Sequence, residues 1–106
     1  MVKPVHYTEV SGGSFIGQID FTYAELVSWL GEPNAPTDGY KTDVEWAVKL
    51  EDGTGLTIYN YKDGDNYNHD GTRNEDLTNW HIGSAVQDPT LVDKLLNELF
   101  ELSQKS

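Results

Sequence analysis

Histidine and carboxylate side chains are the groups in this 106-residue chain that could carry acid–base or metal chemistry. The three histidines, His6, His69 and His81, have no spacing typical of metal ligands, and the chain contains no His-Glu-x-x-His motif. No serine lies in a nucleophile elbow, and no run of glycines has the form of a phosphate-binding loop. Since none of the usual catalytic constellations is present, the sequence predicts a protein that is not an enzyme and that needs neither a metal nor a cofactor.

The polar segment 62–76 (KDGDNYNHDGTRNED) suggests one metal site, a calcium-binding loop. From Asn66 to Gly71, asparagine, aspartate and glycine match positions one, three, five and six of an EF-hand loop. Position twelve would be Leu77, however, where the EF-hand needs a glutamate that binds calcium with both oxygens. No helical pattern flanks the segment, so an exposed loop without calcium is the better interpretation.

The charge of the chain indicates the kind of partner it would bind. There are 18 acidic and 7 basic side chains, and the net charge of −11 argues against binding to a phosphate backbone and favours a basic partner. The alternative is that the charge only keeps the surface well solvated. Cysteine is absent, which excludes disulfides and thiolate metal sites and fits a reducing compartment. No apolar run has the length of a signal peptide or a membrane span, so we expect a soluble cytoplasmic protein that binds no membrane.

Alternation of apolar and polar side chains over residues 44–61 predicts a β-hairpin. A two-residue turn would place Val48 opposite Thr57. A three-residue loop that ends at Gly53 would instead place Val48 opposite Leu56 and gather the aliphatic side chains on one face, so we favour this register. The opposite face of the hairpin then carries Glu45, Ala47, Lys49, Thr57, Tyr59 and Tyr61.

Three further strands are expected outside the central hairpin. Residues 5–10 and 15–21 read as short strands joined by a glycine-rich turn into an N-terminal hairpin, and residues 78–84 read as a last strand. Neighbouring side chains of a strand point to opposite faces, so Trp80 is expected in the core and His81 on the open side of the sheet.

Two helices are predicted, each with a clear beginning. Thr22 and Glu25 form a capping box before the first helix, which Gly31 ends. Asp88 followed by proline begins the second helix. We therefore expect a single α+β domain over residues 1–106, with strands and helices in the order ββαβββα and both helices packed on one face of an antiparallel sheet. The apolar stripe of the second helix consists of Leu91, Val92, Leu95, Leu96, Leu99 and Leu102.

Acidic residues crowd the middle of the chain, and tyrosines lie between them. Tyrosine supplies rigid contact area with a polar tip, and carboxylates could occupy an arginine- and lysine-lined groove that normally holds nucleic acid. A solvated sheet face with paired tyrosines is the alternative. The predicted partner-binding residues are Glu45, Lys49, Tyr59, Tyr61, Asp63, Asp65, Tyr67, Asp70, Glu75 and Asp76.

Two other functions stay open. A small-ligand module, such as one that sequesters a nucleotide signal, would need cationic or aromatic groups that converge in a pocket. A structural protein could bury the tyrosine face and Phe100, which lies outside the apolar stripe of the second helix, in a homodimer. The residues that could line the ligand site are Lys41, Lys62, Arg73, Trp80 and His81.

Several motifs of the chain resemble those of a phage protein family. TYAELVSWLGEP, VEWAVKLEDGTGLTIYNYKDG and TNWHIGS, followed by an amphipathic helix, are similar over residues 22–84 to small uncharacterised proteins of bacteriophages and prophages. In that family EW, EDGT, TIY-Y-K and WHIGG-like motifs recur in this order, and here Ser84 stands in place of the second glycine of the last motif. The resemblance implies an accessory protein that acts on a host system, as inhibitors of host nucleases and anti-CRISPR proteins do. We therefore expect a non-enzymatic protein that binds and inhibits a basic, nucleic-acid-handling or defence protein in the host cytoplasm and makes no direct contact with nucleic acid.

Overall fold

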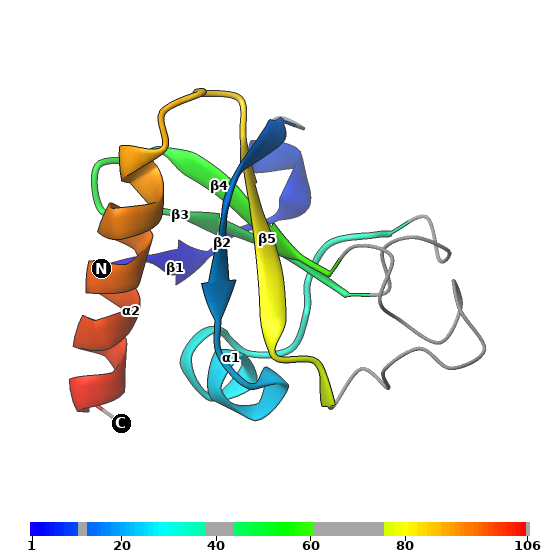
Figure 1. The fold of residues 1–106 in the computed structure, drawn as a ribbon, viewed down its shortest axis with the longest axis vertical. Coiled ribbons are helices and arrows are strands. Elements are labelled where there is room, and N and C mark those ends of the chain that lie inside the picture. Colours follow the sequence, from blue (N-terminus) through cyan, green and yellow to red (C-terminus); the bar gives the residue numbers. More distant parts are fainter. Residues whose placement is uncertain (11–12, 38–43, 61–75, 106) are drawn as a thin grey trace.

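The computed structural model describes residues 1–10, 13–37, 44–60 and 76–105 and shows a five-stranded antiparallel sheet with two helices (Figure 1). The strands lie in the order β1-β3-β4-β5-β2 across the sheet. Both helices contribute buried residues to the single core on one face of the sheet, which confirms the predicted α+β architecture. The elements are β1 (Lys3–Pro4), the 3-10 helix η1 (Tyr7–Glu9), β2 (Ser14–Asp20), α1 (Tyr23–Leu30), β3 (Glu45–Lys49), β4 (Gly55–Tyr59), β5 (Asn79–Ser84) and α2 (Thr90–Lys105).

The β3–β4 hairpin has the register that the aliphatic pattern predicts. Val48 lies opposite Leu56. The Leu50 N–H donates to the Thr54 carbonyl at 2.9 Å, and the Gly53 N–H donates to the Leu50 carbonyl at 2.9 Å. Gly53 has a φ of 91°, a left-handed conformation that glycine adopts without strain. The three-residue loop is therefore confirmed, and it sends the aliphatic side chains of both strands into the core.

The predicted N-terminal hairpin is wrong. β1 pairs with β3, whereas β2 pairs with β5 at the opposite edge of the sheet. Between β1 and β2, His6 and Glu9 form a capping box, in which the Thr8 N–H donates to His6 Nδ1 and the His6 N–H donates to Glu9 Oε2, both at 3.3 Å. These side chains satisfy the local backbone in a turn, so the chain leaves the extended conformation instead of forming a strand over residues 5–10.

Both helices begin at the caps that the sequence indicates. The Glu25 N–H donates to Thr22 Oγ1 at 3.0 Å, and the Thr22 N–H donates to Glu25 Oε1 at 2.9 Å. Gly31 ends α1 with a φ of 84°. At the start of α2, the hydroxyl and the N–H of Thr90 donate to Asp88 Oδ1 at 2.7 and 3.0 Å, and these bonds hold the pKa of Asp88 below its ordinary value.

Two fully buried tryptophans join the sheet to α1. The rings of Trp46 and Trp80 meet edge to face, with centroids 5.2 Å apart. The indole N–H of Trp46 donates to the Gly31 carbonyl at 2.8 Å, and that of Trp80 donates to the Phe21 carbonyl at 2.9 Å. Since these two carbonyls lie just beyond the two ends of α1, the helix is held over this face at both ends.

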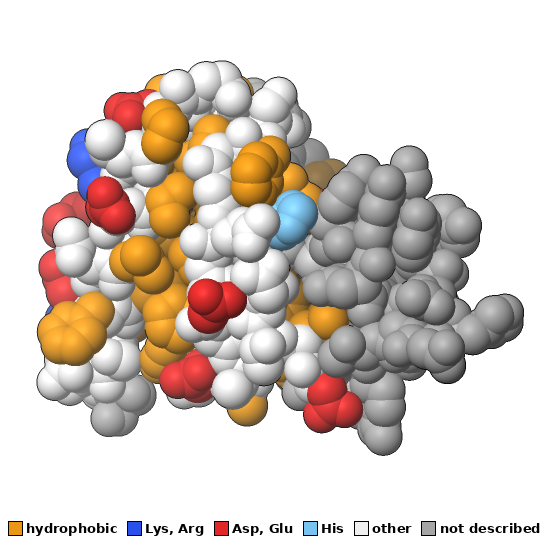
Figure 2. Space-filling view, in the orientation of Figure 1, with side chains coloured by type: hydrophobic (Ala, Val, Ile, Leu, Met, Phe, Trp, Pro, Cys, Tyr) orange, Lys and Arg blue, Asp and Glu red, His pale blue; other side chains and the backbone are white. Residues whose placement is uncertain are grey.

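The second helix is held against the same face by apolar packing. Leu91, Leu95 and Leu99 are buried in the core, while Val92 and Leu96 are half-buried. In the view of Figure 1, a band of hydrophobic side chains is visible between α2 and β2 (Figure 2). Neither α2 nor any other helix in the described ranges is long and apolar enough to cross a membrane.

Candidate functional site

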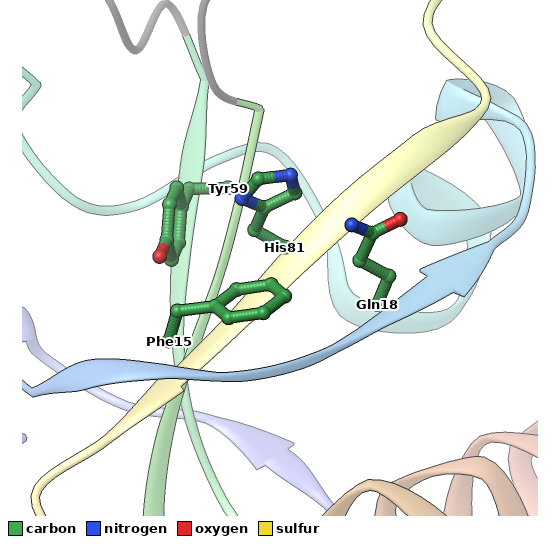
Figure 3. Close-up of a pocket in the computed structure, with 4 residues that line it drawn as sticks. All are labelled: Phe15, Gln18, Tyr59 and His81. Atoms are coloured by element: carbon green, nitrogen blue, oxygen red, sulfur yellow. The ribbon is translucent and has the colours of Figure 1, made fainter.

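The face of the sheet opposite the helices holds a shallow, open hollow lined by Phe15, Gln18, Tyr59 and His81 (Figure 3). Its volume is about 500 Å³. Three of the four lining side chains are rings, and no carboxylate lines it among the described residues. The hollow is therefore an aromatic surface on a strongly acidic chain.

Three strands bring these four side chains together. Tyr59 of β4 lies opposite His81 of β5, and His81 lies opposite Gln18 of β2. The register of β2 shifts between Phe15 and Gly17, so that Phe15 and Gln18 are on the same face although they are three residues apart. The centroid of the His81 ring is 4.9 Å from that of Phe15 and 5.7 Å from that of Tyr59.

Gly83 makes room for the aromatic rings. A Cβ atom at this position would lie 2.9 Å from Thr57 Oγ1 and 3.3 Å from Tyr59 Cε1. Phe15 is the β2 residue opposite Gly83. The Tyr59 ring therefore lies close against the backbone of β5, where any larger residue would push it outward.

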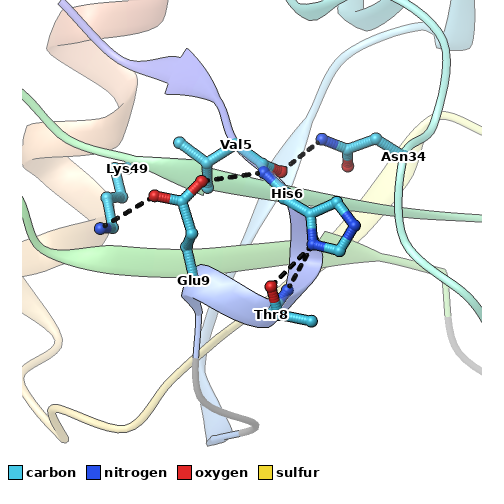
Figure 4. A network of polar contacts seen from close by, with 6 residues as sticks. All are labelled: Val5, His6, Thr8, Glu9, Asn34 and Lys49. Atoms are coloured by element: carbon cyan, nitrogen blue, oxygen red, sulfur yellow. Dashed lines mark hydrogen bonds and ion pairs between the residues drawn. The ribbon is translucent and has the colours of Figure 1, made fainter.

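The other end of this face is covered by the N-terminal segment (Figure 4). Lys49 Nζ forms an ion pair with Glu9 Oε1 at 3.6 Å, and Val10 packs on Gly55, since a Cβ there would lie 3.2 Å from Val10 Cγ1. Asn34 lies beside this segment and donates from Nδ2 to the Val5 carbonyl at 2.8 Å. Among the described residues, the face is thus covered near β1 and left uncovered near β2 and β5.

The structure brings some of the predicted partner-binding residues together. Glu45 lies opposite Tyr59 on the open face, and both are half-buried. Lys49 is on the same face, but its ammonium group is paired within the chain. Asp76 is exposed shortly before β5 and does not line the hollow.

Of the predicted ligand-site residues, the structure describes His81 and Trp80. His81 lines the hollow, as the alternation of the last strand indicates. Trp80 has none of its surface exposed, so its place in the ligand site is wrong. The calcium interpretation of residues 66–71 lies outside the described residues. The same holds for the other predicted site residues, which are Lys41, Tyr61, Lys62, Asp63, Asp65, Tyr67, Asp70, Arg73 and Glu75.

Phe15 and Gln18 are the site residues that the sequence does not reveal. Their position depends on the pairing of β2 with β5, whose residues lie 59 or more positions further along the chain than their partners in β2. It also depends on the shift of register after Phe15. Strict alternation would place Phe15 with Gly17 on the opposite face from Gln18. Gly17 is the single local sign of an irregular strand at this point.

The described residues contain no group of three or more His, Cys, Asp and Glu side chains that could hold a metal ion. Comparisons with protein-family models, with curated proteins and with solved structures found no match. The two observations that bear on function are therefore the exposed aromatic hollow and the net charge of −11.

Proposed function

We propose that this protein is a non-enzymatic binding protein that engages a basic surface of a nucleic-acid-handling or defence protein and inhibits it. The observation that carries the proposal is an open aromatic hollow, on a sheet face that neither described helix covers, in an acidic chain. Phe15 has 49% of its surface exposed, although burial of a phenylalanine side chain would stabilise the fold. A large exposed aromatic side chain of this kind is typical of a binding surface.

The chemistry of the hollow suits arginine and lysine side chains. An arginine guanidinium can stack on the rings of Phe15 and Tyr59, and each such contact at an exposed site contributes about 0.5–1 kcal/mol. The Gln18 side-chain carbonyl can accept a hydrogen bond from the same group. The net charge of the chain adds a longer-range attraction that speeds association and weakens as salt increases.

The resemblance to phage and prophage proteins suggests where such a partner would be found. An acidic protein of this size that occupies the basic groove of a host nuclease or an anti-phage complex would compete with the nucleic acid for the same arginine and lysine side chains. The partner would then be a protein of the bacterial host cytoplasm, and inhibition would need no catalysis.

The proposal is tested by affinity capture from a bacterial lysate with three forms of the protein as bait. The forms are the wild type, the double variant Phe15→Ser/Tyr59→Ser, and Val86→Ser, which removes a 54% exposed apolar side chain away from the hollow. We expect the wild type and Val86→Ser to retain a basic protein that elutes when salt rises from about 0.1 to 1 M, and the double variant to lose it. Added wild-type protein should also displace nucleic acid from the purified partner. Equal retention by all three baits, or a partner whose nucleic-acid binding is unaffected, would contradict the proposal.

A second candidate function follows from the size of the hollow. Its volume of about 500 Å³ lies within the range of small-molecule sites, and the rings of Phe15, Tyr59 and His81 offer faces for a flat ligand such as a nucleobase. A nucleotide signal held there would stabilise the native state and raise the melting temperature. A thermal-shift screen with cyclic nucleotides and ADP-ribose derivatives checks this, and an unchanged melting temperature at millimolar ligand excludes it.

A further inference from the structure

β2 is an edge strand that none of the described residues covers with a strand on its outer side. It pairs with β5 along one side and is last in the sheet order. Alternate backbone N–H and C=O groups of an edge strand point away from its neighbour and remain available for pairing. Outside this pairing, Gln87 Nε2 donates a long hydrogen bond of 3.4 Å to the Ser14 carbonyl of β2. Of the seven residues of β2, only the last, Asp20, is charged.

The apolar surface of α2 extends beyond what the sheet covers. Successive residues of a helix are 100° apart, so Val92, Leu96 and Phe100 lie at steps of 40° around α2, away from the buried leucines. Their exposure increases in the same order, from the half-buried Val92 and Leu96 to Phe100, which is 65% exposed. We refer to these three residues as the α2 shoulder.

The shoulder is on the β2 side of the helix. A Cβ atom at Gly17 of β2 would lie 2.7 Å from Val92 Cγ2, whereas Glu98 on the opposite flank of α2 accepts a hydrogen bond from the Glu51 N–H at 2.9 Å, at the β3–β4 turn. The hydrophobic band between α2 and β2 in Figure 2 corresponds to this side. An apolar helix surface therefore lies beside the sheet edge whose outer backbone groups pair with no strand in the described part of the chain.

We propose that the β2 edge and the α2 shoulder together bind an extended segment of a partner protein, which adds a sixth strand to the sheet. The outer backbone groups of β2, which no strand pairs within the described residues, suit an extended strand as the occupant, and the shoulder would cover the apolar side chains on one face of that strand. The side chains on its other face would lie next to Phe15 and Gln18, within reach of the aromatic hollow. The segment that fits best alternates apolar residues with lysine or arginine.

Charge selects a basic partner over a second copy of this chain. Each copy carries −11, so self-association would bring two strongly acidic chains together. Figure 2 shows acidic side chains on both sides of the hydrophobic band, whereas Lys and Arg side chains are visible only at the left edge of the molecule. The basic character of the partner rests on the proposed function, whereas pairing at the β2 edge rests on the geometry alone.

The test uses a peptide of about nine residues that alternates lysine and valine, together with two N-methylated forms of it. In one form every valine nitrogen is methylated, and in the other every lysine nitrogen. All three forms have the same charge, but each methylated form can pair along only one of its two edges. We expect one methylated form to bind like the parent and the other to lose binding in a titration followed by calorimetry. Equal affinity for both methylated forms would overturn strand addition, because simple charge attraction does not distinguish them.

Two protein variants test the shoulder with the same peptide. Phe100→Asp should weaken binding roughly tenfold, as expected when an apolar contact is lost from an interface, although it makes the protein more acidic. Asn97→Asp adds the same charge at an exposed position of the same helix and should leave the affinity unchanged or slightly higher. Identical behaviour of the two variants would overturn the role of the shoulder. A wild-type dimer in sedimentation that Phe100→Asp dissociates would show that a second copy is the occupant and would also overturn the proposal.

These experiments distinguish failure of strand addition at the β2 edge from failure of the proposed function. If the methylated peptides differ but no basic protein is captured from the lysate, strand addition stands and the proposed function fails. If the hollow variants lose a captured partner while both methylated peptides bind equally, the proposed function stands and strand addition fails.

Discussion

The two edges of the sheet are built in opposite ways. At the β3 edge, the Val5 N–H donates to the Ala47 carbonyl at 3.0 Å, and the Ala47 N–H donates to Asn34 Oδ1 at 2.8 Å. The Ala35 N–H then donates to the Glu45 carbonyl at 3.2 Å. At the β2 edge, a seven-residue strand has no such cover among the described residues, and an apolar helix surface lies beside it.

Within the described residues, other segments of the chain therefore cover the β3 edge, whereas none covers the β2 edge. Because β1 is two residues long, it would leave most of β3 unpaired, and the side-chain amide of Asn34 takes the place of a backbone amide in the ladder. Sheet edges without such protection tend to pair with other chains, so an edge left open beside exposed apolar surface is expected to have a use. The protective feature that the described residues show at the β2 edge is the bulge after Phe15.

The largest expected effect is at the closed edge. Asn34→Ala removes the acceptor for the Ala47 N–H, which belongs to a residue only 1% exposed, and the donor to the Val5 carbonyl. We expect a loss of about 3 kcal/mol in the free energy of unfolding, the upper end for buried groups left unsatisfied. Urea unfolding followed by circular dichroism measures the change.

The matched substitution at the open edge is Gln18→Ala, for which a change within about 0.5 kcal/mol is expected, as for most surface positions. Similar losses at the two positions would contradict the distinction between a closed and an open edge. Asn34→Asp keeps the acceptor and removes the donor, so it should fall between the wild type and Asn34→Ala.

A smaller effect is expected where α2 meets the open edge. Gly17→Ala would place a Cβ 2.7 Å from Val92 Cγ2, so the helix shoulder and β2 must separate slightly. We expect a loss of about 1 kcal/mol, at the low end for overpacking, because the half-buried Val92 side chain can move. Chemical denaturation measures it. A neutral or stabilising result would show that the shoulder does not pack on β2 at this position.

The smallest effect is expected at the β3–β4 turn, away from both edges. The hydroxyl and the N–H of Thr54 donate to the Asp52 carboxylate, which lowers the pKa of Asp52 below its ordinary value of 3.8. A lowered pKa in the folded state gives stability that is present above pH 3.8 and is lost as the pH falls further. The stability difference between the wild type and Asp52→Asn should therefore shrink below about pH 4 in urea titrations. A difference that grows in acid would contradict this assignment.

Local signals in the sequence were sufficient for the elements whose partners are close in the chain. The loop that ends at Gly53 and the capping box of Thr22 and Glu25 depend on a few neighbouring residues, and both are confirmed. The prediction of an N-terminal hairpin is wrong because the true partner of β2 is distant in the chain. Adjacent strand-like runs suggested mutual pairing, but the residues that pair with β2 are those of β5, and no local pattern encodes a partner so far along the chain.

The residues of the candidate site also differ in whether local patterns in the sequence predict their position. Tyr59 and His81 were expected on the open face because alternation within a strand determines which way each side chain points. Phe15 and Gln18 join them only through sheet order and through a bulge, which reverses the alternation in the middle of β2. The open edge itself could not be predicted, since it is defined by which strand has no neighbour.

Amide hydrogen exchange measured by NMR, with and without the lysine–valine peptide, tests the open edge most directly. We expect alternate amides of β2 to exchange more slowly when the peptide is bound, while the amides of β3 and the N–H of Val5 at the closed edge are unchanged. Slower exchange at the β3 edge, or no change in β2 at peptide concentrations that saturate binding, would contradict the claim that β2 is the edge at which this protein binds its partner.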